Sequence, residues 1–184
     1  MVWVIVAIVV IAALAVLGYA AMQRRRTAQL QQRFGREYDR EIERRGDRRE
    51  AESELQERFS RHQDLDIREL DPAARREYAA RWRQAQANFV DQPAVAIAEA
   101  DALVIEVMRD RGYPTGGDFE QRAADVSVDH PDVVEHYRAA HGISQRATEG
   151  GAGTEDLRQA MVHFRALFDE LLGADQRHTT EAGR

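Results

Sequence analysis

The sequence predicts an all-α protein with three parts: an N-terminal transmembrane helix, a charged helical stalk and a small antiparallel helical bundle. The first 22 residues are apolar and carry no charge, whereas residues 23–71 are dense in arginine and acidic residues. In residues 72–173 apolar side chains recur every three or four positions, the period of an amphipathic helix. We expect the polar tail, residues 174–184, to be disordered.

The composition restricts the chemistry that the chain can carry. It has no cysteine, which excludes disulfides, thiolate metal sites and a cysteine nucleophile. A net charge of −6 argues against nucleic acid as the main partner. A length of 184 residues is enough for one membrane anchor and one domain with its own core.

The predicted anchor is residues 1–22. As a helix these residues would rise about 33 Å, close to the hydrocarbon core of about 30 Å. Trp3 and Tyr19 stand near its two ends, where aromatic rings favour the membrane interface. A cleaved signal peptide is the alternative, because Gly18 and Ala20 resemble a cleavage site, but no basic residue precedes the apolar run.

The charges that follow the anchor predict its orientation. Five arginines precede the first acid, Glu37: Arg24, Arg25, Arg26, Arg33 and Arg36. Arginine next to a transmembrane helix stays on the cytoplasmic side. We therefore expect a single-pass protein of the cell (plasma or inner) membrane with its soluble domain in the cytoplasm.

The stalk carries one apolar stripe with a spacing of four residues. The stripe is Leu30, Phe34, Tyr38 and Ile42, and it resumes as Ala51, Leu55 and Phe59. Gly35 and Gly46 weaken this helix. A solvated helix with ion pairs is the simplest interpretation. A coiled coil that makes a homo-oligomer, or a helix lying on anionic lipid, are the alternatives.

The bundle carries clear helix start and stop signals. Asp71-Pro72 and Asp91-Gln92-Pro93 open two helices, the second of which ends at Gly112. Asp118 opens a short helix, and residues 129–131 open the next one. The last helix runs from Thr154 to Gly173 on a continuous apolar stripe: Leu157, Ala160, Met161, Phe164, Leu167, Phe168, Leu171 and Leu172.

Three strings in this region carry a resemblance: RWRQAQANFVDQP, EADALVIEVMRDRGYP and DVSVDHPDVVEHYRAAH. They resemble a group of uncharacterised bacterial proteins with an N-terminal membrane anchor. The resemblance covers residues 78–172 and excludes the stalk. It implies a helical domain on a single-pass anchor, and it implies no catalytic residue, because the group has no established activity.

Asp101 is the most informative single residue. On a helical wheel it lies at the centre of the apolar face, between Ile97, Val104, Ile105 and Met108. A buried carboxylate needs a partner, and we expect an arginine, the Trp82 indole or a tyrosine hydroxyl. Arg122 is a reasonable candidate. The alternative is a functional carboxylate that lines a pocket.

Asp129, Asp132 and His136 are the densest set of candidate metal ligands, beside His130. Asp132 and His136 have the i,i+4 spacing that lets two side chains on one helix reach one ion. Asp129 and Asp132 equally suit the N-terminus of a helix, where negative charge is stabilised. Capping is the preferred interpretation, so no metal and no cofactor is assigned.

No motif in the sequence indicates catalysis. There is no glycine-rich phosphate loop after a strand and no nucleophile elbow. The first hypothesis is therefore a non-catalytic protein-interaction module with an unknown protein partner. The second is a small-molecule or metal-binding domain, conceivably an enzyme, that uses the Asp129–His136 region or Asp101.

Overall fold

The computed structural model describes residues 2–173, except for the side chains of Val2 and of residues 4–12. The predicted tail, residues 174–184, lies outside the described residues. The chain divides into two compact units, unit 1 (residues 1–57) and unit 2 (residues 58–184). The boundary between residues 57 and 58 falls inside a helix. The predicted boundary lay further along the chain, between residues 71 and 72.

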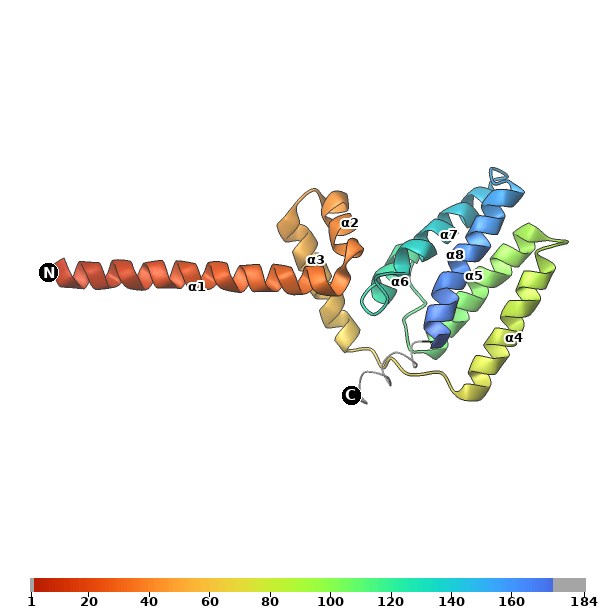
Figure 1. Cartoon of the computed structure of the whole chain (residues 1–184), viewed down its shortest axis with the longest axis horizontal. Helices are drawn as coiled ribbons and strands as arrows, with labels where there is room; N and C mark the ends of the chain where they lie inside the picture. The colour runs from red at the N-terminus through yellow and green to blue at the C-terminus, as the bar shows by residue number, and fades with distance from the viewer. Residues whose placement is uncertain (1, 174–184) are drawn as a thin grey trace. The chain divides into compact units, whose positions relative to one another are not determined.

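Unit 1 is built from three helices: α1 (Val2–Phe34), α2 (Arg36–Arg45) and the first part of α3 (Arg48–Gln63) (Figure 1). The helical conformation is interrupted at Gly35 and Gly46, which have φ angles of 49° and 73°. Glycine adopts this left-handed region without a steric penalty. The predicted stalk is therefore divided among separate helices, and the chain is not helical between Leu65 and Asp71.

The predicted apolar stripe forms much of the small core of unit 1. Its buried members are Leu30, Phe34, Tyr38, Ala51 and Leu55. One carboxylate also joins the three helices, since Glu52 on α3 accepts hydrogen bonds from Thr27 on α1 and from Tyr38 on α2, both at 2.8 Å. Burial and the Glu52 carboxylate raise the pKa of Tyr38.

The transmembrane part of the predicted fold class is wrong. Among the described residues, none of the helices combines the length and the apolarity needed to cross a membrane. Of the predicted anchor, residues 1–22, the structure describes the side chains of Trp3 and of residues 13–22. α1 then continues unbroken through three arginines, Arg24 to Arg26. The other predicted anchor residues lie largely outside the described side chains, and the membrane localisation and orientation stay predictions.

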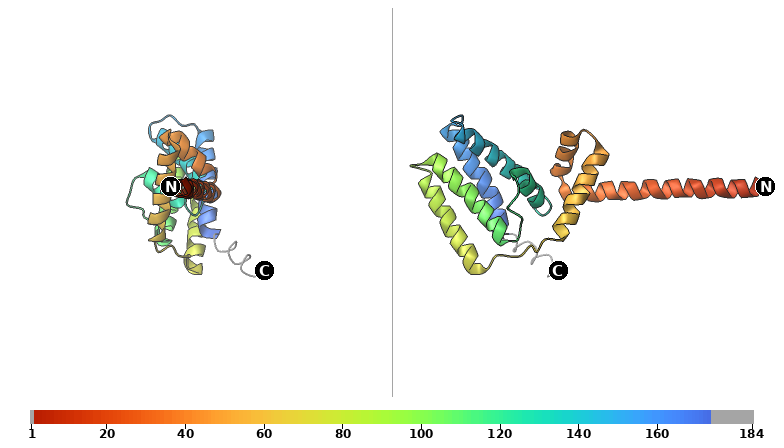
Figure 2. Two further views of the ribbon diagram at one scale, coloured as in Figure 1. Left: turned by 90° about the vertical axis from the view of Figure 1, so that its left-hand side faces the viewer. Right: turned by 180° about the vertical axis from the view of Figure 1, so that it is seen from behind.

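Unit 2 confirms the predicted helical bundle. Its complete helices are α4 (Pro72–Asn88), α5 (Pro93–Asp110), α6 (Phe119–Val126), α7 (Val134–Thr148) and α8 (Thr154–Gly173). Figures 1 and 2 show α4, α5, α8 and α7 side by side in that order, with the short α6 against α7. The described part of unit 2 contains no strand.

Two helix starts of unit 2, those of α4 and α6, follow the predicted caps. The Asp71 carboxylate accepts a hydrogen bond from the Ala73 N–H at 2.7 Å, and the Asp118 carboxylate accepts one from the Gln121 N–H at 2.8 Å. The start of α7 differs, because the chain turns through residues 127–133 before the helix begins. The His130 N–H still bonds back to the Val126 carbonyl at 2.9 Å, which extends the end of α6.

Apolar residues from α4, α5, α7 and α8 fill the interior of unit 2. Phe164 and Phe168 on α8 are fully buried, and Phe168 stacks on Trp82 of α4 with ring centroids 4.5 Å apart. At the end of α5, Gly112 has a φ of 96° and lies so close to Asp66 that an added Cβ would be 2.2 Å from the Asp66 carbonyl oxygen. Only glycine fits there, so the backbone of Asp66 and Ile67 lies directly against the end of α5.

Candidate functional site

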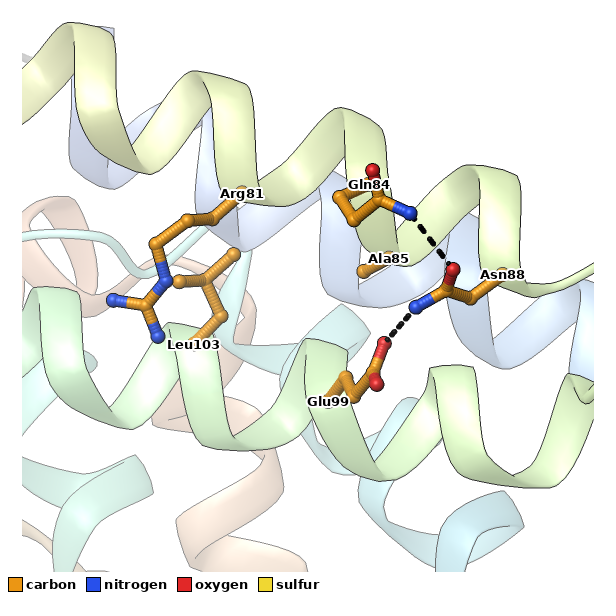
Figure 3. A pocket seen from close by; sticks show the side chains of 6 residues that line it. All are labelled: Arg81, Gln84, Ala85, Asn88, Glu99 and Leu103. Atoms are coloured by element: carbon orange, nitrogen blue, oxygen red, sulfur yellow. Dashed lines mark hydrogen bonds between the residues drawn. The ribbon is translucent and has the colours of Figure 1, made fainter.

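A groove lies between α4 and α5 on the surface of unit 2. Its volume is about 280 Å³. Figure 3 shows α4 on one side and α5 on the other. The lining side chains are Arg81, Gln84, Ala85, Asn88, Glu99 and Leu103.

The groove has an apolar floor and a polar rim. Ala85 and Leu103 are buried and form the floor. Along the rim, the side-chain amide of Gln84 donates to the side-chain oxygen Oδ1 of Asn88 at 2.9 Å. The side-chain amide of Asn88 in turn donates to the Glu99 carboxylate at 2.9 Å (Figure 3). This chain of hydrogen bonds holds the rim side chains in defined positions between the two helices.

At one end of the rim, Arg81 on α4 forms an ion pair with Glu106 on α5. Its guanidinium donates two hydrogen bonds to Glu106, at 2.6 and 3.0 Å, and lies 5.6 Å from the centre of the Tyr78 ring. The bond from Arg81 lowers the pKa of Glu106. The Tyr78 hydroxyl donates to Asp110 at 2.6 Å, and burial together with that bond raises the pKa of Tyr78.

The charges of the rim are not balanced. Arg81 is neutralised by Glu106, whereas the Glu99 carboxylate accepts from a neutral amide. Val95 lies one turn before Glu99 on the same stripe of α5 and is 49% exposed, and Val90 in the α4–α5 turn is 83% exposed. The groove therefore combines an apolar floor with a negative charge on the rim, and the two exposed valines lie outside its lining.

Asp101 does not line this groove. It is half-buried on α5, and its Oδ1 atom is buried without a hydrogen-bond partner. Burial raises the pKa of Asp101, while the positive charges of His141 and Arg122 oppose that shift. Trp82 is not its partner, because the Trp82 indole N–H is itself buried and unbonded.

The predicted partner Arg122 acts on Asp101 only electrostatically, without a hydrogen bond between the two side chains. Its guanidinium donates to the Gly117 carbonyl at 2.7 Å and approaches the Tyr137 hydroxyl at 3.5 Å. His141, the other neighbouring group, stacks on Phe119 with centroids 3.7 Å apart. Asp101 is therefore half-buried with one buried carboxylate oxygen, and the predicted hydrogen-bonded pair with Arg122 is not formed.

The structure separates the three predicted metal ligands. Asp129 accepts from the Tyr113 hydroxyl and pairs with His62 Nε2, both at 2.7 Å. His136 on α7 instead faces His163 on α8. Asp132 is exposed in the turn before α7, so the assumption that Asp132 and His136 share a helix is wrong.

The preferred capping interpretation of these acids is also wrong. The residue that precedes α7 is Val133, and no side chain caps the helix there. Across the described part of the chain, there is no cluster of three or more His, Asp or Glu side chains that could hold a metal ion.

A second polar cluster surrounds the end of α8, and sequence reasoning missed it. His130 is buried, with Nδ1 3.4 Å from Glu170, and burial together with the Arg111 charge lowers the pKa of His130. Arg111 donates to the Leu171 carbonyl at 2.8 Å. These partners are 40 or more residues apart in the sequence, so no local spacing could have indicated them.

Comparison with known proteins assigns no relative. No family model, curated protein or solved structure matches the chain. The resemblance to anchored bacterial proteins therefore stays a prediction.

Proposed function

We propose that the bundle of unit 2 is a protein-interaction module that binds a segment of a partner protein in the α4–α5 groove. The observation that carries the proposal is the buried floor of Ala85 and Leu103 beneath a hydrogen-bonded polar rim. A volume of about 280 Å³ lies just below the range of about 300–1,000 Å³ for small-molecule pockets. It suits one or two side chains that anchor a larger partner.

The rim indicates the chemistry of that partner. An apolar side chain would cover Leu103, and the amides of Gln84 and Asn88 would bond to the partner's backbone. The Glu99 carboxylate favours a nearby arginine or lysine, because its neighbour in the rim is a neutral amide. The expected ligand is a peptide segment with an apolar anchor next to a basic residue.

Site-specific photo-cross-linking tests the proposal in cells that produce the full chain. A photoreactive residue at Gln84 should yield a discrete protein adduct, identified by mass spectrometry. Glu99→Lys should suppress that adduct, because it reverses the rim charge without touching the core. The melting temperature of Glu99→Lys should stay close to that of the parent, since Glu99 is exposed.

Positions on α8 provide the matched control. Arg165 and Asp169 form an exposed i,i+4 ion pair and do not line the groove. A photoreactive residue at Arg165 should give no adduct of the same mass, and Asp169→Lys should leave the Gln84 adduct unchanged. Equal adducts from both positions, or a Gln84 adduct that survives Glu99→Lys, would refute the groove as the binding surface.

A further inference from the structure

Two histidines from neighbouring helices meet at the surface of unit 2. His136 lies on α7 and His163 on α8, and their Nδ1 atoms are 2.9 Å apart. The rings are stacked, with centroids 5.1 Å apart and planes inclined by 30°. His136 is exposed and His163 is half-buried, so the pair is accessible from solvent.

We propose that His136 and His163 together bind a late first-row transition-metal ion, with Cu²⁺ and Ni²⁺ as the preferred ions. The inference goes beyond the proposed protein interaction, and it stands if the α4–α5 groove binds nothing. It concerns a ligand pair other than the predicted set of Asp129, Asp132 and His136.

The ligand type supports this choice of metal, because imidazole suits Cu²⁺ and Ni²⁺ and the affinity of a nitrogen site for divalent ions is highest for Cu²⁺. Imidazole nitrogens bind such ions at about 2.0–2.1 Å. Two of them at a right angle around one ion are then about 2.9 Å apart, and at a tetrahedral angle about 3.3 Å. In the metal-free protein the 2.9 Å contact is a hydrogen bond in which the two nitrogens point at each other, so both rings must turn for their lone pairs to converge on one ion.

The two imidazoles are also available as ligands. A metal-binding nitrogen must be unprotonated, and the hydrogen bond between the two Nδ1 atoms requires at least one of them to be an acceptor. The rest of the coordination sphere is open to water, because the described residues hold no group of three or more ligands. An ion at this point would join α7 to α8 opposite the glycine-rich turn, residues 149–153.

Titration of the purified full chain with CuCl₂ tests the site, with calorimetry for affinity and electron paramagnetic resonance for the ligands. The parent should bind one ion at this pair and show hyperfine coupling from two nitrogens. His136→Ala and His163→Ala should each weaken binding by more than about tenfold, since even second-shell substitutions cost 10–100-fold. Both variants should keep the metal-free melting temperature, and Cu²⁺ should raise it in the parent alone.

Another histidine, His62, provides the matched control. His62→Ala removes the partner of Asp129 and should leave the affinity and the spectrum of the pair unchanged. A parent that does not bind Cu²⁺, or a double His136→Ala/His163→Ala variant that binds it as tightly as the parent, would show that the two rings form only a hydrogen bond.

Discussion

The two units bury different kinds of side chain. The core of unit 2 contains more than twenty buried apolar residues, drawn mainly from α4, α5, α7 and α8. Among the described side chains of unit 1, the buried apolar residues are Leu30, Phe34, Tyr38, Ala51 and Leu55, and two acids, Glu37 and Glu41, are buried with them. The stability of unit 2 therefore depends on apolar area, and that of unit 1 depends on charged hydrogen bonds as well.

This difference leads to a difference in response to solvent. Burial of apolar surface depends little on ionic strength, whereas partly exposed ion pairs are screened by salt. Glu41 on α2 bonds to both Arg44 and Arg45, whose side chains are 50% and 33% exposed. We expect unit 1 to open more readily than unit 2, and to do so more readily in high salt.

The largest expected effect tests the apolar core of unit 2. Phe168→Ala should lower the free energy of unfolding by about 3–5 kcal/mol, because it removes a buried ring stacked on Trp82. Urea denaturation followed by tryptophan fluorescence measures the change. Val162→Ala on the same helix is the control and should cost less than about 0.5 kcal/mol, since Val162 is half-exposed. Equal effects of the two substitutions would contradict the core assignment.

The second effect tests the charged interior of unit 1. Glu41→Ala should destabilise α2 by about 1.5–3 kcal/mol, the range for hydrogen bonds to charged groups. Amide hydrogen exchange of α2 measures the local opening. The protection that Glu41 provides should shrink when NaCl is raised from 0.1 to 1 M, because the Debye length falls from about 10 to 3 Å. The exposed Glu43→Ala is the control, and an equal loss of protection there would remove the distinction between the units.

The third effect concerns the one half-buried acid of the α5 apolar face. Burial raises the pKa of Asp101 above 3.8, so the folded state holds its proton more tightly than the unfolded state does. The stability of the parent should therefore fall as pH rises from about 3.8 through the raised pKa. Asp101→Asn should remove that fall and stabilise the protein at pH 7 by up to about 1 kcal/mol.

Urea melts at pH 4 and pH 7 measure the effect of Asp101→Asn. The exposed Asp132→Asn is the control and should leave the pH dependence unchanged. A large loss of stability in Asp101→Asn at pH 7 would instead mean that the charged carboxylate is needed, as in a buried ion pair.

The smallest expected effect tests a solvent-exposed ion pair of unit 2, between Arg81 and Glu106. Glu106→Gln should cost about 0.5 kcal/mol, because its partner Arg81 is 45% exposed and the pair is well solvated. Arg81 lowers the pKa of Glu106 below 4.5, so this contribution is present above about pH 4.5 and is lost as pH falls through the lowered value. Thermal melts at pH 7 and pH 3 would detect it, and Glu77→Gln on α4 is the control.

Short-range signals predicted much of unit 2. Asp71-Pro72, Pro93 and Asp118 begin helices as their local chemistry indicates, and the stripe of α8 is buried as its spacing predicts. These features depend on residues within one or two turns of each other. The start of α7 was placed too early, because the backbone bond from His130 to Val126 is invisible in the sequence pattern.

Contacts between distant residues could not be predicted in the same way. The pairs His136–His163 and His62–Asp129 join residues 27 and 67 positions apart. The groove depends on the packing of α4 against α5, so a residue such as Gln84 carries no local signal of its role. The wheel placed Asp101 on a buried face, but only the fold reveals that Arg122 bonds to Gly117 instead.

The close approach at Gly112 has a mechanical consequence. The Arg68 N–H bonds to the Arg111 carbonyl at 2.8 Å, and the Arg68 side chain bonds to the Asp110 carbonyl at 2.9 Å. Tension applied to the chain ahead of residue 64 would therefore load the end of α5 before it reached α4. Since α5 packs against both α4 and α8, the load is shared by the centre of the bundle, and the edge helix is shielded from being peeled away.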